Sequence, residues 1–243
     1  MKATVVIPTY NECDNIEQLV SQILELEPTL EVLIVDDNSP DGTGELADAL
    51  AASNPGRVQV IHRPAKLGLG TAHIAGFKQA LSQGAERVLS MDADFSHHPR
   101  YIPAILAKSR EAHLVIGSRY VRGGGTRFCS LKRRALSLGA NLFAKLMLGL
   151  PARDCTAGFR CYQREVLLSI NLDDIFSNGY SFLIEMIYRT KTQGWRVAEV
   201  PITFEDRRHG VSKISRREIY AALYTVLRLT GWRLRRRQEP KPD

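Results

Sequence analysis

Two aspartates, Asp92 and Asp94, stand one residue apart in the stretch LSMDADFSHHP (89–99), and His97 and His98 follow them closely. Carboxylates this close together repel each other unless something positive lies between them. In an extended segment, residues i and i+2 point the same way, so we expect both carboxylates to face one ligand. That ligand would be a hard divalent cation, which takes oxygen ligands and keeps waters and substrate phosphates. We interpret the two histidines as polar groups of a turn.

Short apolar, β-branched segments alternate with helical patterns through the first half of the chain, which predicts a doubly wound, mostly parallel sheet. The predicted strands are 3–8, 31–37, 57–63, 87–94 and 113–119, and the predicted helices are 14–26, 41–53, 69–83 and about 99–110. Asp14 and Asp41 occupy expected N-cap positions, and Gly84 an expected helix end. Since ligands gather at the carboxyl ends of such strands, acids at three strand ends are expected to share one cleft: Glu12, Asp36, Asp37, Asp92 and Asp94.

The regular alternation stops after residue 119. A helix is predicted at 130–150, a strand at 158–163, a helix at 180–193, a strand at 196–204 and a final helix at 214–231, followed by a frayed basic tail. No internal repeat or linker divides the chain. We therefore predict one α/β catalytic domain at 1–213 and a C-terminal basic amphipathic helix with its tail at 214–243.

Composition indicates the cellular compartment and the charge of the partners, but not the reaction. The formal net charge is +7 and the calculated pI is about 9.4, which suits nucleic acid, a membrane surface or a phosphorylated substrate equally well. The four cysteines show no CxxC spacing, which favours a reducing compartment. The sequence shows neither a signal peptide nor a long uncharged apolar stretch, so we expect a soluble or peripheral protein.

Other nucleotide and phosphate motifs fit poorly. The stretch GLGTAH (68–73) begins like GxGxxG, but it follows the third predicted strand, and the first βα turn, PTYNE (8–12), contains no glycine. A P-loop is absent from the sequence. DADFS (92–96) is similar to the motif of aspartate-nucleophile phosphatases, yet that motif belongs at a first strand rather than a fourth.

Eight segments in family order resemble family 2 glycosyltransferases of the GT-A fold, most closely the dolichyl- or polyprenyl-phosphate mannose synthases. They span roughly residues 3 to 217 and read VVIPTYNE, VDDNSPDGT, HRPAKLGLGTA, MDADFSHHP, GSRYVRGGG, LKRR, AGFRCY and RRHGVSKIS. The resemblance implies a GT-A, Rossmann-like single domain with a C-terminal helical elaboration that faces a membrane.

The same resemblance implies roles for individual residues. Asp92, Asp94 and Ser96 would hold Mg²⁺ or Mn²⁺ against the donor diphosphate, although some members have glutamine where Ser96 stands. The donor nucleotide would be bound by ten residues: Pro8, Tyr10, Glu12, Val35, Asp37, Lys66, Asp92, Ala93, Arg207 and Lys213. Arg207 and Lys213 would close over the donor from a loop.

A basic run without acids covers residues 112–153. Its cations are Arg119, Arg122, Arg127, Lys132, Arg133, Arg134, Lys145 and Arg153. We interpret the run as a site for an anionic acceptor, because a phosphate monoester is already ionised at neutral pH and needs no general base. By resemblance, Arg119, Arg133 and Ser137 would bind this phosphate, and Asp92, Asp94, Arg119 and Arg133 would be the catalytic residues.

The predicted activity is inverting transfer of a hexose, mannose from GDP-mannose above all, to a polyprenyl (dolichyl-type) phosphate. UDP-glucose as donor, a sugar hydroxyl as acceptor, and a non-enzymatic protein that binds anionic lipid or nucleic acid stay open as alternatives. Segments 131–150 and 218–237 are suited to a membrane interface. We therefore expect a peripheral enzyme on the cytoplasmic face of a membrane, with membrane-anchoring subunits as further partners and no bound nucleic acid.

Overall fold

The computed structural model describes residues 1–128, 131–205 and 216–238. Within these ranges, the side chains of residues 132, 133, 216, 217 and 235–238 are outside the description. The predicted boundary at 213/214 and the donor-loop residues Arg207 and Lys213 also lie outside the described residues.

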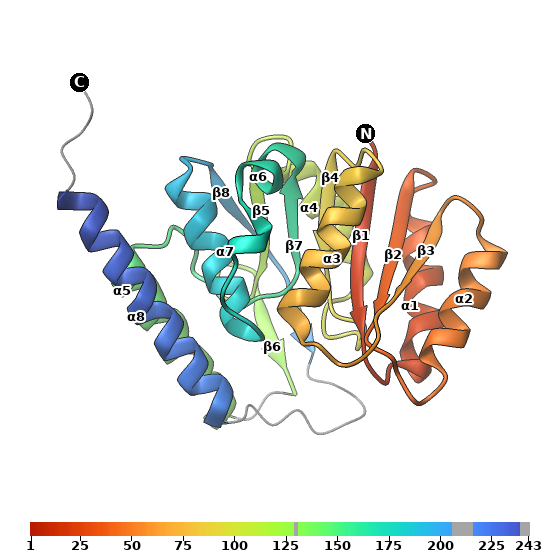
Figure 1. Cartoon of the computed structure of the whole chain (residues 1–243), viewed down its shortest axis with the longest axis horizontal. Helices are drawn as coiled ribbons and strands as arrows, with labels where there is room; N and C mark the ends of the chain where they lie inside the picture. Colours follow the sequence, from red (N-terminus) through yellow and green to blue (C-terminus); the bar gives the residue numbers. More distant parts are fainter. Residues whose placement is uncertain (129–130, 206–215, 239–243) are drawn as a thin grey trace.

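A seven-stranded sheet forms the centre of the molecule, in the order β3-β2-β1-β4-β7-β5-β8 (Figure 1). Its strands are β1 (Ala3–Thr9), β2 (Leu30–Asp36), β3 (Val58–His62), β4 (Arg87–Ser90), β5 (Leu114–Ser118), β7 (Arg160–Gln163) and β8 (Val197–Pro201). Only β7 runs antiparallel to its neighbours in this sheet; every other pair is parallel. The predicted mostly parallel α/β sheet is confirmed.

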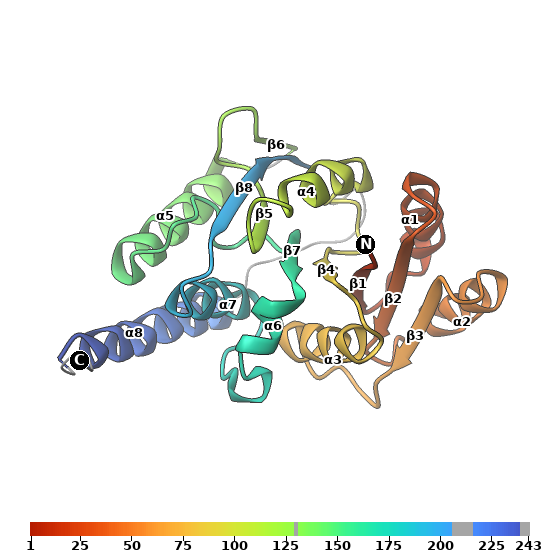
Figure 2. The same ribbon diagram turned by 90° about the horizontal axis from the view of Figure 1, so that it is seen from above.

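Helices cover both faces of this sheet (Figure 2). Those of the described residues are α1 (Cys13–Leu26), α2 (Thr43–Ser53), α3 (Leu69–Ser82), α4 (Ile102–Lys108), α5 (Leu131–Leu148), α6 (Arg164–Ser169), α7 (Tyr180–Thr192) and α8 (Arg216–Gln238). Short 3₁₀ turns, η1 (Pro99–Tyr101) and η2 (Leu172–Asp174), precede α4 and α7, and a separate parallel pair joins β6 (Gly125–Arg127) to β9 (Thr203–Glu205).

The side chains of the central strands point alternately to the two faces of the sheet, and both faces are buried. On β1, Val5 and Ile7 belong to the core beneath α1, α2 and α4, whereas Val6 belongs to the core beneath α3 and α7. Leu33 and Val35 of β2 share the face of Val6. This period of two follows from strand geometry, and it accounts for the continuous apolar runs in the sequence.

Several boundaries differ from the sequence-based expectation. β4 ends at Ser90, so Asp92 and Asp94 lie in the loop beyond the strand. Asp14 is wrong as an N-cap, because Glu12 occupies that position and Asp14 lies in the first turn of α1. The basic tail predicted to fray is helical as far as Gln238.

The C-terminal helix α8 packs against α5 and α7. Val226 and Leu229 of α8 are buried in the same core as Ala144 and Leu148 of α5. None of the helices in the described part of the chain is long and apolar enough to cross a membrane. The described cysteines are free, and burial raises the pKa of both Cys155 and Cys161 to about 12.

Helix α3 lies unusually close to the sheet at Gly76. A Cβ atom added there would lie 2.3 Å from Cγ1 of Val6 on β1. The first two turns of α3 lie beside the carboxyl ends of the strands. The close packing at Gly76 therefore determines how near these turns lie to that edge of the sheet.

We expect Gly76→Ala to lower the free energy of unfolding by about 1–3 kcal/mol, since an overpacked core forces side chains off their rotamers. Urea denaturation measures this change. Gly231→Ala in α8 is the matched control, because a Cβ there meets nothing within 4 Å, and we expect equal or slightly higher stability. Wild-type stability in Gly76→Ala would contradict the packing argument.

Candidate active site

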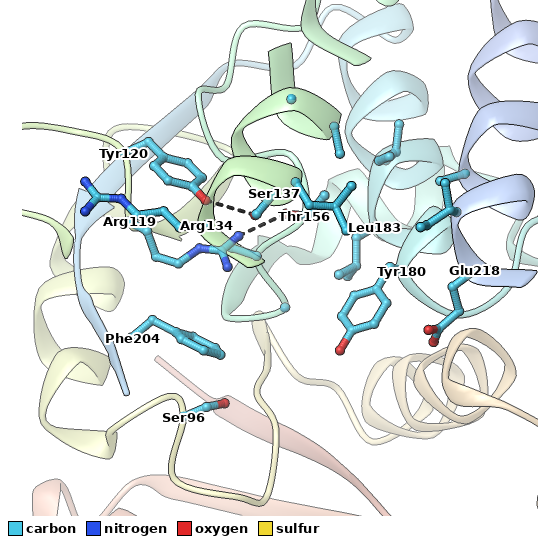
Figure 3. A pocket seen from close by; sticks show the side chains of 18 of the residues that line it. Ser96, Arg119, Tyr120, Arg134, Ser137, Thr156, Tyr180, Leu183, Phe204 and Glu218 are labelled. Carbon is cyan, nitrogen blue, oxygen red and sulfur yellow. Dashed lines mark hydrogen bonds between the residues drawn. The ribbon is translucent and has the colours of Figure 1, made fainter. Parts of the chain in front are cut away.

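A cavity of about 440 Å³ opens at the edge of the sheet where the parallel strands end (Figure 3). The loop after β4 contributes Asp92, Asp94 and Ser96, and the end of β5 contributes Arg119 and Tyr120. The remaining walls come from α3, α5, α7, α8, β6, β9 and the segment 156–158. Among the described side chains, the predicted metal and acceptor residues Asp92, Asp94, Ser96, Arg119 and Ser137 therefore share one cavity.

The loop after β4 is not extended: it turns, and hydrogen bonds between its own residues hold the turn. The Asp92 amide donates to Nδ1 of His97 (3.2 Å), and the Ser96 amide donates to Oδ1 of Asp94 (3.0 Å). Phe95 between them has a φ of 59°. Our argument from i, i+2 alternation in an extended segment is thus wrong, although both carboxylates still line the same cavity.

The two histidines of this loop belong to its scaffold. His97 is buried between the rings of Phe159 and Phe204, with centroids 5.4 and 5.6 Å away. Nδ1 of His98 accepts a hydrogen bond from the Arg100 amide (3.2 Å) at the start of η1. Their interpretation as polar groups of the turn is confirmed.

The donor atoms around Asp92 and Asp94 suit a hard divalent cation. Ser96 is 1% exposed, and its Oγ has no hydrogen-bond partner among the described residues. A buried hydroxyl without a partner costs free energy that a bound ion would recover. The described part of the chain holds no group of three or more His, Cys, Asp or Glu side chains suited to a metal. Two carboxylates and one hydroxyl would leave further coordination positions to water and phosphate.

Apart from Asp92, the predicted nucleotide residues that the structure describes do not line this cavity, and several lie at the neighbouring strand ends. Asp37 is buried and paired with Arg63, whose Nη1 lies 2.5 Å from Oδ1. Lys66 places its Nζ 3.8 Å from the ring centroid of Tyr10. Arg63 was not foreseen from the sequence, since nothing local links it to Asp37.

The other predicted nucleotide residues are mainly parts of the scaffold. Pro8 and Val35 are partners in the β1–β2 register, and the side chain of Val35 is fully buried. Ala93 is also buried. Glu12 donates its amide to Oγ1 of Thr43 (3.0 Å) and accepts from Asn15 (2.9 Å). Any contact of Val35 and Ala93 with a nucleotide would therefore be made largely by backbone atoms.

Asp41 ties the starts of α1 and α2 together. It accepts hydrogen bonds from Oγ1 and the amide of Thr43 (2.6 and 3.1 Å) and from the amide of Cys13 (3.2 Å). Burial by itself would raise the pKa of Asp41, but these hydrogen bonds outweigh burial and lower it. Asp41 is wrong as the N-cap of α2, because Gly42 occupies that position, although the Asp41 carboxylate accepts the amide of Thr43 at the start of the helix.

Arg119, which is 13% exposed, forms a largely buried bidentate ion pair with the fully buried Asp154. Its Nε and Nη2 each lie 2.7 Å from a carboxylate oxygen, and its backbone amide donates to the same group (3.0 Å). Glu199 of β8 accepts the amides of Arg153 and Asp154 (both 2.9 Å). Arg127, another cation of the acid-free run, lies 3.9 Å from Glu205. Acids outside the run therefore offset part of its positive charge.

Ser137 lines the cavity and is oriented by Tyr120, which donates its hydroxyl to Oγ of Ser137 (2.9 Å; Figure 3). Arg134, one helical turn earlier on α5, also lines the cavity. The side chain of Arg133 is outside the description, so its predicted role stays a prediction. Tyr120 was missed by the sequence reasoning, and Arg134 was named only as one cation of the basic run, although both stand in motifs that it used.

The far wall of the cavity is apolar. It is built by side chains of α5, α7 and α8, namely Phe143, Leu183, Ile184, Leu223 and Val226. Tyr180 and Glu218 add two polar groups at its rim (Figure 3). One cavity thus combines carboxylates, an arginine and hydroxyl pair, and a surface suited to hydrocarbon.

Comparisons with known proteins agree with this arrangement. Residues 4–170 match the glycosyl transferase family 2 model. The chain is 46% identical to polyprenol monophosphomannose synthase of Mycolicibacterium smegmatis, covering 93% of this chain and 85% of the relative. It is 44% identical to undecaprenyl-phosphate mannosyltransferase of Micrococcus luteus, covering 98% and 97%.

A solved structure shows the same architecture. Glucosyl-3-phosphoglycerate synthase of Mycobacterium tuberculosis, in complex with Mn²⁺, UDP and glucosyl-3-phosphoglycerate, superimposes with a TM-score of 0.69. It is 22% identical and covers 95% of this chain and 80% of its own. The fold is therefore the single-domain GT-A architecture of nucleotide-sugar transferases. The chain belongs to glycosyltransferase family 2 and is a glycosyltransferase.

We expect Asp154→Asn to lower the free energy of unfolding by about 3 kcal/mol, because it removes one charge from a buried ion pair and leaves the Arg119 guanidinium poorly compensated. Urea denaturation gives the value. Lys2→Met, which breaks the half-exposed Lys2–Glu31 pair, is the control and should cost about 0–1 kcal/mol. Equal losses of unfolding free energy in the two variants would show that the Arg119–Asp154 pair stabilises the fold no more than the exposed pair does.

Proposed function

We propose that this glycosyltransferase transfers a mannosyl group from a nucleotide sugar to a polyprenyl phosphate. The observation that carries the proposal is the composition of the cavity. Asp92 and Asp94 lie on one side, Arg134 and Ser137 on another, and a hydrocarbon-like wall continues from them. A phosphorylated lipid requires that combination, whereas a purely soluble sugar acceptor does not need the apolar wall. The names of the two relatives support the same substrate class.

Each side of the cavity has a distinct task in this reaction. Asp92, Asp94 and Ser96 would hold Mg²⁺ or Mn²⁺, which supplies Lewis-acid stabilisation of the departing nucleoside diphosphate. Arg134, Arg133 and Ser137 would hold the acceptor phosphate near the donor. Arginine suits this task because its planar fork binds phosphate in a bidentate manner. Arg119 holds the segment 154–158 in place through its ion pair with Asp154. Its guanidinium would therefore contact the acceptor phosphate while it remains paired with Asp154.

The bond changes need no protein base. An ionised oxygen of the acceptor phosphate attacks the anomeric carbon, the bond from that carbon to the diphosphate oxygen breaks, and the nucleoside diphosphate leaves with the electron pair. Inversion at the anomeric carbon follows from a single displacement. The acceptor supplies its own negative charge at neutral pH, because the second pKa of a phosphate monoester is near ~6.

The donor is proposed to be GDP-mannose, with UDP-glucose as the alternative. A direct assay incubates the protein with either labelled donor, Mg²⁺ or Mn²⁺ and a polyprenyl phosphate, and then counts label in the organic phase. Label from GDP-mannose would support the proposal. Label from UDP-glucose alone would show that the transferred sugar is glucose rather than mannose. A folded protein that gives no organic-phase label with any donor or metal contradicts the proposed function.

We expect Asp94→Asn to reduce transfer by at least about 100-fold, because it removes a carboxylate from the oxygen cluster around the proposed cation. The organic-phase assay measures the rate over a range of Mg²⁺ and Mn²⁺ concentrations. Asp173→Asn changes an exposed acid that pairs with Lys78 far along the chain and should keep the wild-type rate. Full activity of Asp94→Asn would show that its carboxylate holds no metal.

Arg133→Ala and Arg134→Ala test the acceptor side. Loss of either guanidinium should raise KM for polyprenyl phosphate by about tenfold, since a charge-assisted hydrogen bond contributes roughly 1.5–3 kcal/mol. KM for the donor should stay near its wild-type value. The reverse pattern, in which donor KM rises and acceptor KM does not, would move these arginines to the donor site.

A membrane surface is the proposed partner of α5 and α8. Both helices expose apolar stripes: Leu131, Leu138, Leu142 and Leu146 on α5, and Tyr220, Tyr224, Leu227 and Leu234 on α8. These stripes adjoin the cavity that would bind the lipid phosphate, so the bilayer holding the acceptor would contact them directly. We propose a peripheral position on the cytoplasmic face, with small anchoring subunits as further partners, and a C-terminal element beginning at residue 214.

We expect the double variant Leu142→Glu, Leu227→Glu to bind vesicles of phosphatidylglycerol and phosphatidylcholine about tenfold more weakly, because each change removes an apolar side chain from the interface. Co-sedimentation measures the bound fraction. Leu168→Glu, at an equally exposed leucine of α6 (60%), is the control and should bind like the wild type. Unchanged binding of the double variant would contradict this orientation.

A further inference from the structure

His73 is a buried polar side chain that the proposed mechanism leaves unused. It lies in the second turn of α3, is 1% exposed, and lines the cavity with Asp92 and Ser96. Its ring stacks on Phe182 of α7 at a centroid distance of 5.6 Å and an interplanar angle of 6°. Phe77 lies 5.6 Å from it on the same helix.

Neither ring nitrogen of His73 has a hydrogen-bond partner among the described residues. An unpaired buried polar group costs about 1–3 kcal/mol. Phenylalanine would fill a similar space beside Phe77 and Phe182 without this cost. The imidazole therefore destabilises the free protein unless a water or a ligand in the cavity supplies its partners.

The charge state of this imidazole follows from its surroundings. Burial, then the nearby charges of Arg160 and His97, lower the pKa of His73 to about 3. Arg160 of β7 is itself fully buried and donates to the carbonyls of Cys155, Ala157 and Leu183. At neutral pH the ring of His73 is thus uncharged, with one nitrogen donating and the other accepting.

This donor and acceptor pair selects the chemistry of its ligand. A phosphate offers only acceptors and is best bound by a cation, whereas a hydroxyl both donates and accepts. A group with a pKa of about 3 is also too weak a base to remove a proton from a hydroxyl at neutral pH. A neutral imidazole beside the metal-binding loop is therefore suited to hold a sugar hydroxyl in place.

We propose that His73 is a specificity-determining residue that hydrogen-bonds a hydroxyl of the hexosyl group carried by the donor. This inference rests on the proposed function, because it takes a nucleotide sugar as the occupant of the cavity. It places the sugar between the Asp92–Asp94 loop and His73, whose ring is backed by the buried Phe182. The nucleoside diphosphate itself makes no contact with His73.

Binding measurements with and without the sugar test this assignment. Calorimetric titration with Mg²⁺ compares the affinity for GDP-mannose with that for GDP, or for UDP-glucose with UDP if the wild type binds the uridine donor. We expect His73→Phe to weaken nucleotide-sugar binding by about tenfold, because a sugar hydroxyl is left unpaired against a phenyl ring. Binding of the nucleoside diphosphate should stay within about twofold of wild type.

Two further variants separate a sugar contact from a packing effect. His73→Gln keeps one donor and one acceptor, so it should recover part of the sugar affinity. Phe77→Leu disturbs the same aromatic cluster without lining the cavity, so it should lower stability and leave the ratio of the two affinities unchanged. His73→Phe should also raise the urea midpoint of the free protein, since it removes an unpaired imidazole.

The outcomes distinguish this inference from the proposed function. Equal loss of nucleotide-sugar and nucleoside diphosphate affinity in His73→Phe would overturn the sugar contact, as would wild-type affinity for both. A lower urea midpoint in His73→Phe would overturn the claim that the imidazole lacks a partner. If the wild type binds the donor but labels no polyprenyl phosphate, the proposed acceptor fails while the affinity ratio still decides the role of His73.

Discussion

The buried ion pair between Arg119 and Asp154 is the constraint on which the geometry of the cavity depends. It fixes the end of β5 to the segment that leads into β7, and the Asp154 amide is held in turn by Glu199 of β8. A buried pair resists separation, because either charge left alone would be strongly destabilising. The segment 154–158 therefore keeps its place beside the loop after β4, where a Cβ on Gly158 would lie 3.4 Å from Asp92. This contact therefore helps to position the proposed acceptor side of the cavity against the proposed donor side.

Positive charge is arranged around the cavity at two depths. Arg160 lies in the interior with backbone carbonyls as acceptors of its hydrogen bonds, and Arg134 lies on the cavity wall. Carbonyl dipoles satisfy the donors of a guanidinium without cancelling its charge, so the field of Arg160 extends into the neighbouring space. A ligand with a diphosphate and a second phosphate would enter a region where some of its negative charge is already offset. The net charge of +7 thus has a local use that overall composition could not reveal.

The sequence predicted those parts of the fold that depend on local patterns. The apolar runs of β1 and β2 and the strand–helix alternation specify a parallel sheet, and its carboxyl edge follows from topology. The failures involve partners far apart in the chain. Asp154 lies one residue beyond the basic run that seemed unbalanced, and only the fold brings its carboxylate to Arg119. The turn at Asp92 could not be foreseen either, because it depends on Nδ1 of a buried histidine accepting a backbone amide.

The cavity also shows why residue type alone misranks functional candidates. His97 and His98 stand beside the acidic pair and draw notice in the sequence, yet hydrogen bonds to backbone amides already engage Nδ1 of each ring. His73 stands in a glycine-flanked segment that reads as a failed dinucleotide motif, and its nitrogens are the ones left without partners in the described structure. A polar group that the protein itself leaves unsatisfied lowers stability in the free state, and binding removes that cost only for a ligand with matching donors and acceptors. Ser96 and His73 meet this condition on the same cavity, one suited to a cation and the other to a hydroxyl. Their combination fits the proposed site for a metal-bound nucleotide sugar.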